Sequence, residues 1–351
     1  MKIKNIGKWT VCALVALPLL ACSSSERVED KMMVDDGAVL ISGDLTYEKA
    51  MEALAPLMTK NDVAVMKIIE NGQIGQPVAV DAQLREIKVS SVVHLYFTQS
   101  DEVTARLEVP ARLKDYIKVT YANGRLEAGS SHTNMKSRWK LLEDEEVNLY
   151  VSAPRLESLE LSGATRAQLG DINQAGPVDI VAVGASKVVG KTIRSNAKVR
   201  VNCSGAAELV FKEIYSGGDL AWQCSGSSRL ALDMLTGTTY FFDCSGASKL
   251  TVTRFTHAAD MKVSNSGASR VNVTGNADRV KLNNSGASKV VFTGKAGSLD
   301  VDCSGASKAT LAGSADDANL SVSGVGKIDA TAMKIAKASR HYPQSPAKIE
   351  M

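Results

Sequence analysis

An eight-residue phrase recurs through the second half of the chain and constrains its fold more than any other feature. VDCSGASK at 301–308 has close copies in FDCSGASK, VNCSGAAE, WQCSGSSR, VSNSGASR and LNNSGASK. Aligned on the central glycine, copies recur every 19 to 21 residues, which is typical of a solenoid whose repeats pack only on their neighbours. The nine glycines are Gly163, Gly184, Gly205, Gly226, Gly246, Gly267, Gly286, Gly305 and Gly324.

Apolar residues alternate with polar ones on both sides of each glycine. The position four residues before it is apolar in every copy, from Leu159 to Leu320, and so is the position four residues after it, from Ala167 to Ile328. A period of two predicts a strand, a corner and a second strand. Each coil then has an apolar face that only stacking can bury. We therefore predict an all-β fold, a right-handed parallel β-helix with Ser-Gly-Ala-Ser at its corners.

Strand-like segments precede the repeats and extend the predicted β-helix domain to residues 85–351. The Asn123-Gly124 pair between YIKVTYA and RLEAG predicts a hairpin. A second glycine turn, such as TGNA or TGKA, is expected to close many coils. Residues 22–84 are expected to form a polar tether and a helical segment, with helical spacing of apolar residues at 47–58.

The N-terminus has the features of an export signal over residues 1–21. A start that carries lysines precedes the apolar run WTVCALVALPLLA at 9–21, which is short for a membrane-spanning helix. The run ends in LLAC, which resembles a bacterial lipobox and predicts lipidation at Cys22. Ser23 favours sorting to the outer membrane of the cell envelope, facing the periplasm or the surface. A plain signal peptide with a chance cysteine is the alternative.

A basic residue lies three positions after the corner glycine in eight of the nine copies, and Glu208 occupies the ninth. In register, these residues form a stripe roughly 38 Å long at a strand spacing of ~4.8 Å. Neighbouring like charges repel by up to ~1 kcal/mol in water, less in salt. Either an anionic ligand, such as acidic polysaccharide, lipid A phosphates or DNA, or protection of exposed strands from aggregation would explain them. We call these eight residues the basic ladder: Arg166, Lys187, Arg229, Lys249, Arg270, Lys289, Lys308 and Lys327.

Cysteine and asparagine share the position two residues before the glycine in most copies, where the alternation points side chains inward. Parallel neighbours fit tetrahedral zinc coordination poorly, so we predict no metal. Buried, reduced thiols are expected, and a disulfide between adjacent coils is the alternative. The asparagines are expected to hydrogen-bond to each other and to the corner backbone. The residues are Cys203, Cys224, Cys244, Asn265, Asn284 and Cys303.

The sequence predicts no catalytic residue and no cofactor. Asp243 and Asp302 share a column but lie three coils apart, roughly 14 Å. A glycosidase pair needs about 5–9.5 Å. P-loop, zinc-protease and calcium-binding repeat motifs are missing from the sequence. The formal net charge is +3 and aromatic residues do not interleave with the ladder, so specific nucleic-acid binding is not expected.

The SGAS corners, LESLELSGA at 156–164 and REIKVSSVVHLYFTQSDEVTARLEV at 85–109 resemble the putative auto-transporter adhesin, head GIN domain family of bacterial envelope proteins. The resemblance implies a right-handed β-helix of short coils, often on lipoproteins, and supplies no catalytic residue. We therefore expect a non-enzymatic, lipid-anchored envelope protein that presents a binding surface to an extended, anionic ligand. A structural envelope protein without a diffusible ligand is the alternative, and a polysaccharide-active enzyme is the third interpretation.

Overall fold

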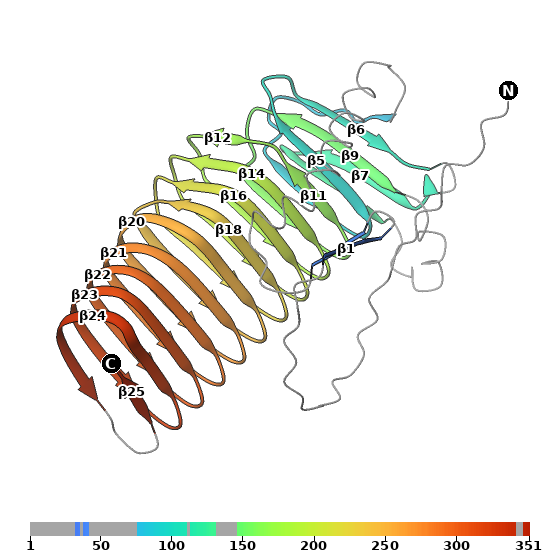
Figure 1. Ribbon diagram of the computed structural model, residues 1–351. Helices are drawn as coiled ribbons and strands as arrows, with labels where there is room; N and C mark the ends of the chain where they lie inside the picture. Colours follow the sequence, from blue (N-terminus) through green and yellow to red (C-terminus); the bar gives the residue numbers. More distant parts are fainter. Residues whose placement is uncertain (1–31, 36–37, 42–75, 111–112, 131–145, 342–346) are drawn as a thin grey trace.

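A parallel β-solenoid forms the long axis of the molecule, with its strands stacked across that axis (Figure 1). The computed structural model describes residues 32–35, 38–41, 76–110, 113–130, 146–341 and 347–351. Cys22, the signal peptide and the helix expected at 47–58 lie outside these residues. Among the residues described, no helix is long and apolar enough to cross a membrane. The predicted all-β solenoid is confirmed.

Each coil has one strand before the corner glycine and one after it. The first repeat has β10 (Ser158–Leu161), β11 (Arg166–Leu169) and β12 (Ile172–Gln174). From β20 to β23, one long strand runs from one corner to the next. The later strands are β13 (Val178–Ala182), β14 (Lys187–Ser195), β15 (Val199–Cys203), β16 (Glu208–Ser216), β17 (Leu220–Cys224), β18 (Arg229–Thr236), β19 (Thr239–Cys244), β20 (Lys249–Asn265), β21 (Arg270–Asn284), β22 (Lys289–Cys303), β23 (Lys308–Val322), β24 (Lys327–His341) and β25 (Lys348–Glu350).

The core is a continuous stack of the inward-facing residues. Leu159 pairs with Ile180 and Ile180 with Val201, so residues at the same offset from the glycine lie above one another. The large side chains of Trp222 and Phe242 continue this column, with ring centroids 5.3 Å apart. All five residues are buried. Burial of this apolar stack is the main force that holds successive coils together, because one coil cannot bury its own apolar face.

The corner glycines stack on one another in the left-handed backbone region. Their φ angles lie between 69° and 84°. Each corner also bonds to the one before it, as when the Ala206 amide donates to the Gly184 carbonyl oxygen over 2.7 Å. The structure has no separate second turn at the glycines of β21, β22 and β23: Gly275, Gly294 and Gly313 lie inside these strands, with φ angles of 155°, 153° and 114°. The bonds between stacked corners help to keep successive coils in register.

Two further coils precede the repeats, and their order in space reverses their order in the chain. β4 (Glu86–Val89) and β5 (Val93–Gln99) pair with β10 and β11. β8 (Arg125–Ser130) and β9 (Val147–Ala153) lie outside them. Ser91, with a φ angle of 71°, takes the place of the corner glycine between β4 and β5. The solenoid is therefore longer than the glycine repeat alone indicates.

Antiparallel strands cover the outermost N-terminal coil. β6 (Thr104–Glu108) pairs with β9, β7 (Ile117–Ala122) with β8, and the short β3 (Gln76–Pro77) with β6. The hairpin predicted at Asn123-Gly124 joins β7 and β8, and both residues have positive φ angles. β1 (Met32–Asp35) and β2 (Ala38–Ile41) pair with each other.

Candidate binding surface

The residues of the basic ladder lie in one column, as predicted. Arg166 pairs in register with Lys187, Arg229 with Lys249, and Lys289 with Lys308. Their neighbours one position along the strand, such as Leu230 and Leu250, are buried. Because side chains alternate between the two faces of a strand, the ladder faces solvent. Glu208 interrupts the column between Lys187 and Arg229, also as predicted.

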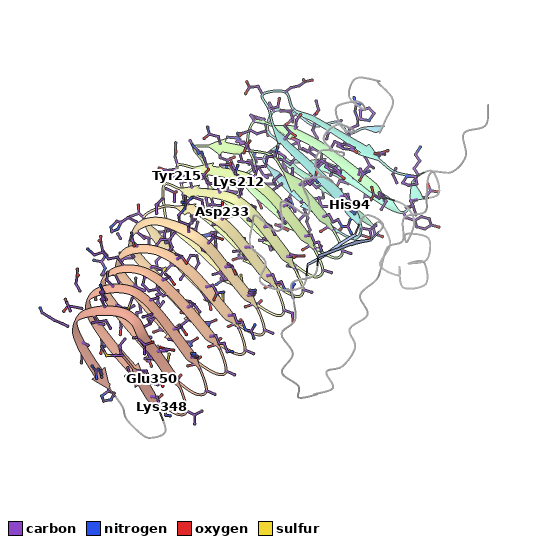
Figure 2. The ribbon with its side chains drawn as sticks, in the orientation of Figure 1. His94, Lys212, Tyr215, Asp233, Lys348 and Glu350 are labelled. Atoms are coloured by element: carbon purple, nitrogen blue, oxygen red, sulfur yellow. The ribbon has the colours of Figure 1, made fainter. Side chains whose placement is uncertain are left out.

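The structure extends this column beyond both ends of the predicted ladder. Lys348 of β25 pairs with Lys327, and His94 of β5 pairs with Arg166. Figure 2 labels His94 toward one end of the solenoid and Lys348 at the other. Neither residue follows a Ser-Gly-Ala-Ser corner, which is why the repeat alignment missed both. The Ser90-Ser91 pair three residues before His94 is the one sequence signal for the earlier corner.

Acidic partners neutralise three lysines of the ladder. Lys187 Nζ lies 3.0 Å from Glu208 Oε2 on the next coil. Toward the C-terminus, Lys308 Nζ lies 3.9 Å from Asp329 Oδ2, and Lys327 Nζ lies 2.7 Å from Glu350 Oε2. The hydrogen bond to Glu350 raises the pKa of Lys327. The sequence analysis did not identify the acids at 329 and 350, because they lie two positions further along their strands.

Three described residues near the centre of the ladder, Arg229, Arg270 and Lys289, lack this compensation. We call Arg229, Lys249, Arg270 and Lys289 the central ladder; they pair in register over four consecutive coils. Within the described part of the chain, no carboxylate oxygen lies within 4.0 Å of the basic nitrogens of Arg229, Arg270 or Lys289, and the three residues are exposed.

The adjoining outward column explains the difference between the centre and the C-terminal end. Two positions after each ladder residue, the central coils carry uncharged side chains. Asp329 and Glu350 occupy this same column at the C-terminal end, where they reach back to the lysine of the coil below. Arg229, Arg270 and Lys289 therefore lie between the ion-paired Lys187 on one side and the ion-paired Lys308 and Lys327 on the other. The uncharged residues beside the central ladder are Ala231, Thr251, Asn272 and Val291.

His94 adds no positive charge to the ladder at neutral pH. Burial, helped by the nearby charge of Arg166, lowers its pKa to about 4. On the same face, the rings of Tyr96 and Tyr150 stack 5.0 Å apart, and Tyr150 donates a hydrogen bond to Glu108 over 3.3 Å. Burial is also the main cause that raises the pKa of Tyr96 to about 12. The positive part of the column therefore begins at Arg166.

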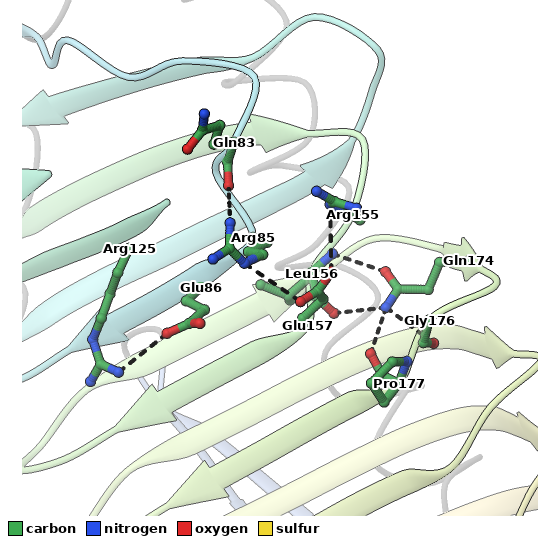
Figure 3. A network of polar contacts seen from close by, with 10 residues as sticks. All are labelled: Gln83, Arg85, Glu86, Arg125, Arg155, Leu156, Glu157, Gln174, Gly176 and Pro177. Carbon is green, nitrogen blue, oxygen red and sulfur yellow. Dashed lines mark hydrogen bonds and ion pairs between the residues drawn. The ribbon is translucent and has the colours of Figure 1, made fainter. Parts of the chain in front are cut away.

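A second charged group lies on the first coils, where one arginine is shared by three carboxylates; Figure 3 shows its contact with Glu86. Arg125 on β8 reaches Glu86 at 3.3 Å, Glu127 at 2.8 Å and Glu160 at 3.1 Å. These three acids come from three strands, so one guanidinium joins three adjacent coils. Nearby, the Gln174 side chain donates to the Pro177 carbonyl oxygen over 2.7 Å. This network links adjacent coils.

The column of cysteines and asparagines faces the core, as predicted. Asn265 donates from Nδ2 to Asn284 Oδ1 over 2.8 Å and to the Lys289 carbonyl oxygen over 2.8 Å. Asn284 in turn donates to the Lys308 carbonyl oxygen over 3.0 Å. The expected bonds between the asparagines and to the backbone beyond the corner are confirmed. The four solenoid cysteines are buried and are free thiols in this structure.

The two aspartates considered for catalysis do not come together. Asp243 pairs with Ser264, Ser264 with Asn283, and Asn283 with Asp302, so three coil spacings separate the carboxylates. The spacing expected from the sequence is confirmed. Among the residues that the structure describes, no group of three or more His, Cys, Asp or Glu side chains is arranged to hold a metal ion.

Comparison with known proteins gives one family and several solved structures. The family model described as putative auto-transporter adhesin, head GIN domain matches residues 83–274 and 256–341. A putative adhesin from Parabacteroides distasonis ATCC 8503 is 16% identical, with 76% of this chain and 95% of that chain covered and a TM-score of 0.40. A putative adhesin from Parabacteroides merdae ATCC 43184 is 15% identical, with 77% and 95% covered and a TM-score of 0.38. No curated protein matches this chain.

Proposed function

Because the chain belongs to the putative auto-transporter adhesin, head GIN domain family, we propose that it is a cell-envelope adhesin that binds an extended polyanion along the basic ladder. Each coil offers one weak, exposed contact, and a polymer that engages several coils gains avidity from their number. Acidic polysaccharide is the ligand class that the surface supports best. An extended polymer can follow the central ladder, which runs straight over four coils.

The missing carboxylates beside Arg229, Arg270 and Lys289 carry this proposal. Where a ladder residue needs neutralisation for stability alone, the chain supplies it, as Glu208 does for Lys187 and Glu350 for Lys327. Arg270 and Lys289 are adjacent in the column, and like charges at ~4.8 Å spacing repel one another without such relief. Anionic groups of a bound polymer would remove this repulsion, so the binding energy would come from charges that the fold leaves uncompensated.

A lipid at Cys22 that anchors the protein in the outer membrane is the second part of the proposal, and the LLAC sequence supports it. The protein is proposed to have no enzymatic activity. Support for this comes from the separation of Asp243 and Asp302, since carboxylates roughly 14 Å apart cannot flank one glycosidic bond.

Retention on immobilised polyanions tests the proposal, with two triple variants that remove the same charge from the same column. The first replaces Arg229, Arg270 and Lys289 with Gln. The matched control replaces the ion-paired Lys187, Lys308 and Lys327 with Gln. Wild type and both variants are eluted from heparin and alginate by increasing salt. Exposed substitutions change stability by about ±0.5 kcal/mol or less, so all three proteins remain folded.

We expect the first variant to elute at clearly lower salt than the wild type and the control variant to elute close to it. Steep salt dependence is expected because the contacts are exposed and are screened over a Debye length of ~8 Å at physiological ionic strength. If both variants eluted at equally reduced salt concentrations, retention would depend on net charge alone. A wild type that is never retained at low salt would contradict ligand binding.

The second candidate function is a structural envelope protein without a diffusible ligand. The ion pairs of Lys187, Lys308 and Lys327 favour it, because they show that the column also stabilises contacts between coils. Exposed basic residues also protect strands from aggregation. Under this alternative, the first variant would aggregate more readily than the wild type. Its retention on polyanions would be unchanged, because the wild type would not be retained either.

A further inference from the structure

Two buried cysteines on adjacent coils lie in direct contact. Cys203 on β15 pairs in register with Cys224 on β17, and their Sγ atoms are 3.0 Å apart. Both side chains are buried in the apolar core. Polyanion binding makes no use of them, and the side chains that fill this position in other coils, such as Ala182 and Val322, show that a thiol is not needed to fill the space.

The contact is compatible with a covalent bond. The spacing of adjacent coils, ~4.8 Å, lies within the range of roughly 4.4–6.8 Å found between the α-carbons of disulfides. Parallel side chains on neighbouring strands argue against a bond, since their sulfurs would stay one coil spacing apart. Cys203 and Cys224 have instead turned toward each other. Their sulfurs need approach by only about 1 Å more to reach bonding distance.

The other two cysteines are placed differently. Cys244 is in register with Cys224 on its far side, so it is a competing partner for the same sulfur. Cys303 has Asn284 and Val322 as its register neighbours. It therefore has no thiol beside it in the column, and it provides an internal control for reactivity that does not depend on a neighbouring cysteine.

The pair also has a defined chemical asymmetry. The hydrogen bond with Cys224 lowers the pKa of the Cys203 thiol, whereas the same contact raises the pKa of Cys224. The thiolate is the form that attacks disulfides.

We propose that Cys203 and Cys224 form a disulfide that cross-links two adjacent coils when the protein meets a disulfide oxidant. The Cys203 thiolate attacks one sulfur of the oxidant, and the other sulfur leaves as a thiolate. Cys224, after losing its proton, attacks the Cys203 sulfur of this mixed disulfide and expels the second oxidant sulfur. The two cysteines lose two electrons and two protons, and the oxidant is reduced to two thiols. Because both cysteines are buried, the exchange takes place before the coils close during folding, or when they open locally.

Peptide mapping of the unmutated full chain tests the proposal directly. The protein is unfolded under reduction, refolded with oxidised glutathione, quenched in acid, alkylated and digested with trypsin. Cleavage after Arg200, Lys212, Arg229, Lys249, Lys295 and Lys308 places each solenoid cysteine on its own peptide. We expect a cross-link between peptides 201–212 and 213–229, with the Cys303 peptide 296–308 alkylated. Alkylation of all four peptides would overturn the proposal, and so would a dominant cross-link to peptide 230–249, which carries Cys244.

A matched pair of variants adds a readout of stability. Cys203→Ala removes the reacting thiol, and Cys303→Ala removes one thiol from the same inward column without affecting the pair. Refolding with the oxidant should raise the Tm of the wild type and of Cys303→Ala relative to their reduced forms, and should leave Cys203→Ala unchanged. An equal rise in all three proteins would contradict the assignment. If Cys203→Ala does not fold, the peptide map of the wild type still decides.

Discussion

A methyl group added to the α-carbon of Gly267 would lie 2.6 Å from the carbonyl oxygen of Gly246, the corner glycine one coil earlier. Gly267 also has a φ angle of 71°, which side-chain-bearing residues rarely adopt. We predict that Gly267→Val lowers the free energy of unfolding by roughly 1–3 kcal/mol from backbone strain alone. The collision with fixed backbone adds to this loss. Urea denaturation of the two proteins measures the difference.

Gly176 provides the matched control for this prediction. A β-carbon there would meet no heavy atom within 4 Å, and the residue is not among the positive-φ glycines. Gly176→Val is expected to leave the unfolding midpoint nearly unchanged. A similar midpoint for Gly267→Val and wild type would show that the corner does not need glycine.

Replacement of Asn284 by Ala should destabilise the protein, because several buried groups depend on its amide. Asn284 accepts from Asn265 and donates to the Lys308 carbonyl oxygen. Loss of a buried partner costs about 1–3 kcal/mol. The outward-facing neighbour Asn283 is the control, and Asn283→Ala should change the free energy of unfolding by about 0.5 kcal/mol or less. Equal effects in denaturant titrations would show that the buried bonds contribute nothing specific.

The protein should become less stable as the pH falls, and part of this loss should depend on His94. Its pKa is about 4 in the folded protein, against 6.5 without the fold, because it is buried and lies near Arg166. Between these pH values the unfolded chain binds a proton that the folded chain does not, so acidification favours unfolding. The contribution is complete above pH 6.5 and is lost as the pH falls toward 4.

Melting temperatures of wild type and His94→Gln, measured from pH 7 to pH 4, check this prediction. The variant should lose less stability than the wild type across that range, because glutamine does not titrate. His257, which is exposed and lies 3.0 Å from Asp278, is the control. If His257→Gln behaves like His94→Gln, burial of His94 is not the cause of the slope.

Cys22→Ala should release the protein from membranes. The prediction depends on the LLAC sequence at the end of the apolar leader, since a lipid on the Cys22 sulfur would be the anchor. Membrane and soluble fractions are compared for wild type and variant, and the N-terminal peptide is weighed by mass spectrometry. Cys12→Ala, within the leader, is the control and should leave partition unchanged. Membrane retention of Cys22→Ala, with no lipid mass on the wild type, would contradict the prediction.

The repeat explains why much of this surface was predictable. Within the repeats, a fixed offset from the glycine defines a column in space, so Arg229 and Lys249 are register partners both in the alignment and in the structure. Alignment by offset gives no prediction for coils that lack the repeated glycine motif. Ser91 occupies a corner without glycine, and β9 lies outside β5 although it follows β5 in the chain. No offset in the sequence encodes that reversal.

The ion pairs were harder to anticipate for a different reason. Asp329 and Glu350 belong to another outward column, and their carboxylates reach ladder lysines one coil away. Alignment by position compares residues within a column, whereas neutralisation depends on distances between columns. The distinction between the ion-paired lysines and the unpaired Arg229, Arg270 and Lys289 therefore required coordinates.

The register is unbroken through β21, β22 and β23, so the number of coils could change without altering either end of the solenoid. The nineteen residues from Gly286 to Ser304 form a complete unit whose two faces match the units above and below it. Duplication of that segment in the gene would insert one further coil and one further residue of the basic ladder, while the N-terminal cap and the final strand would keep their own contacts. Selection could thus adjust the reach of the surface in whole steps, with no need to redesign either end.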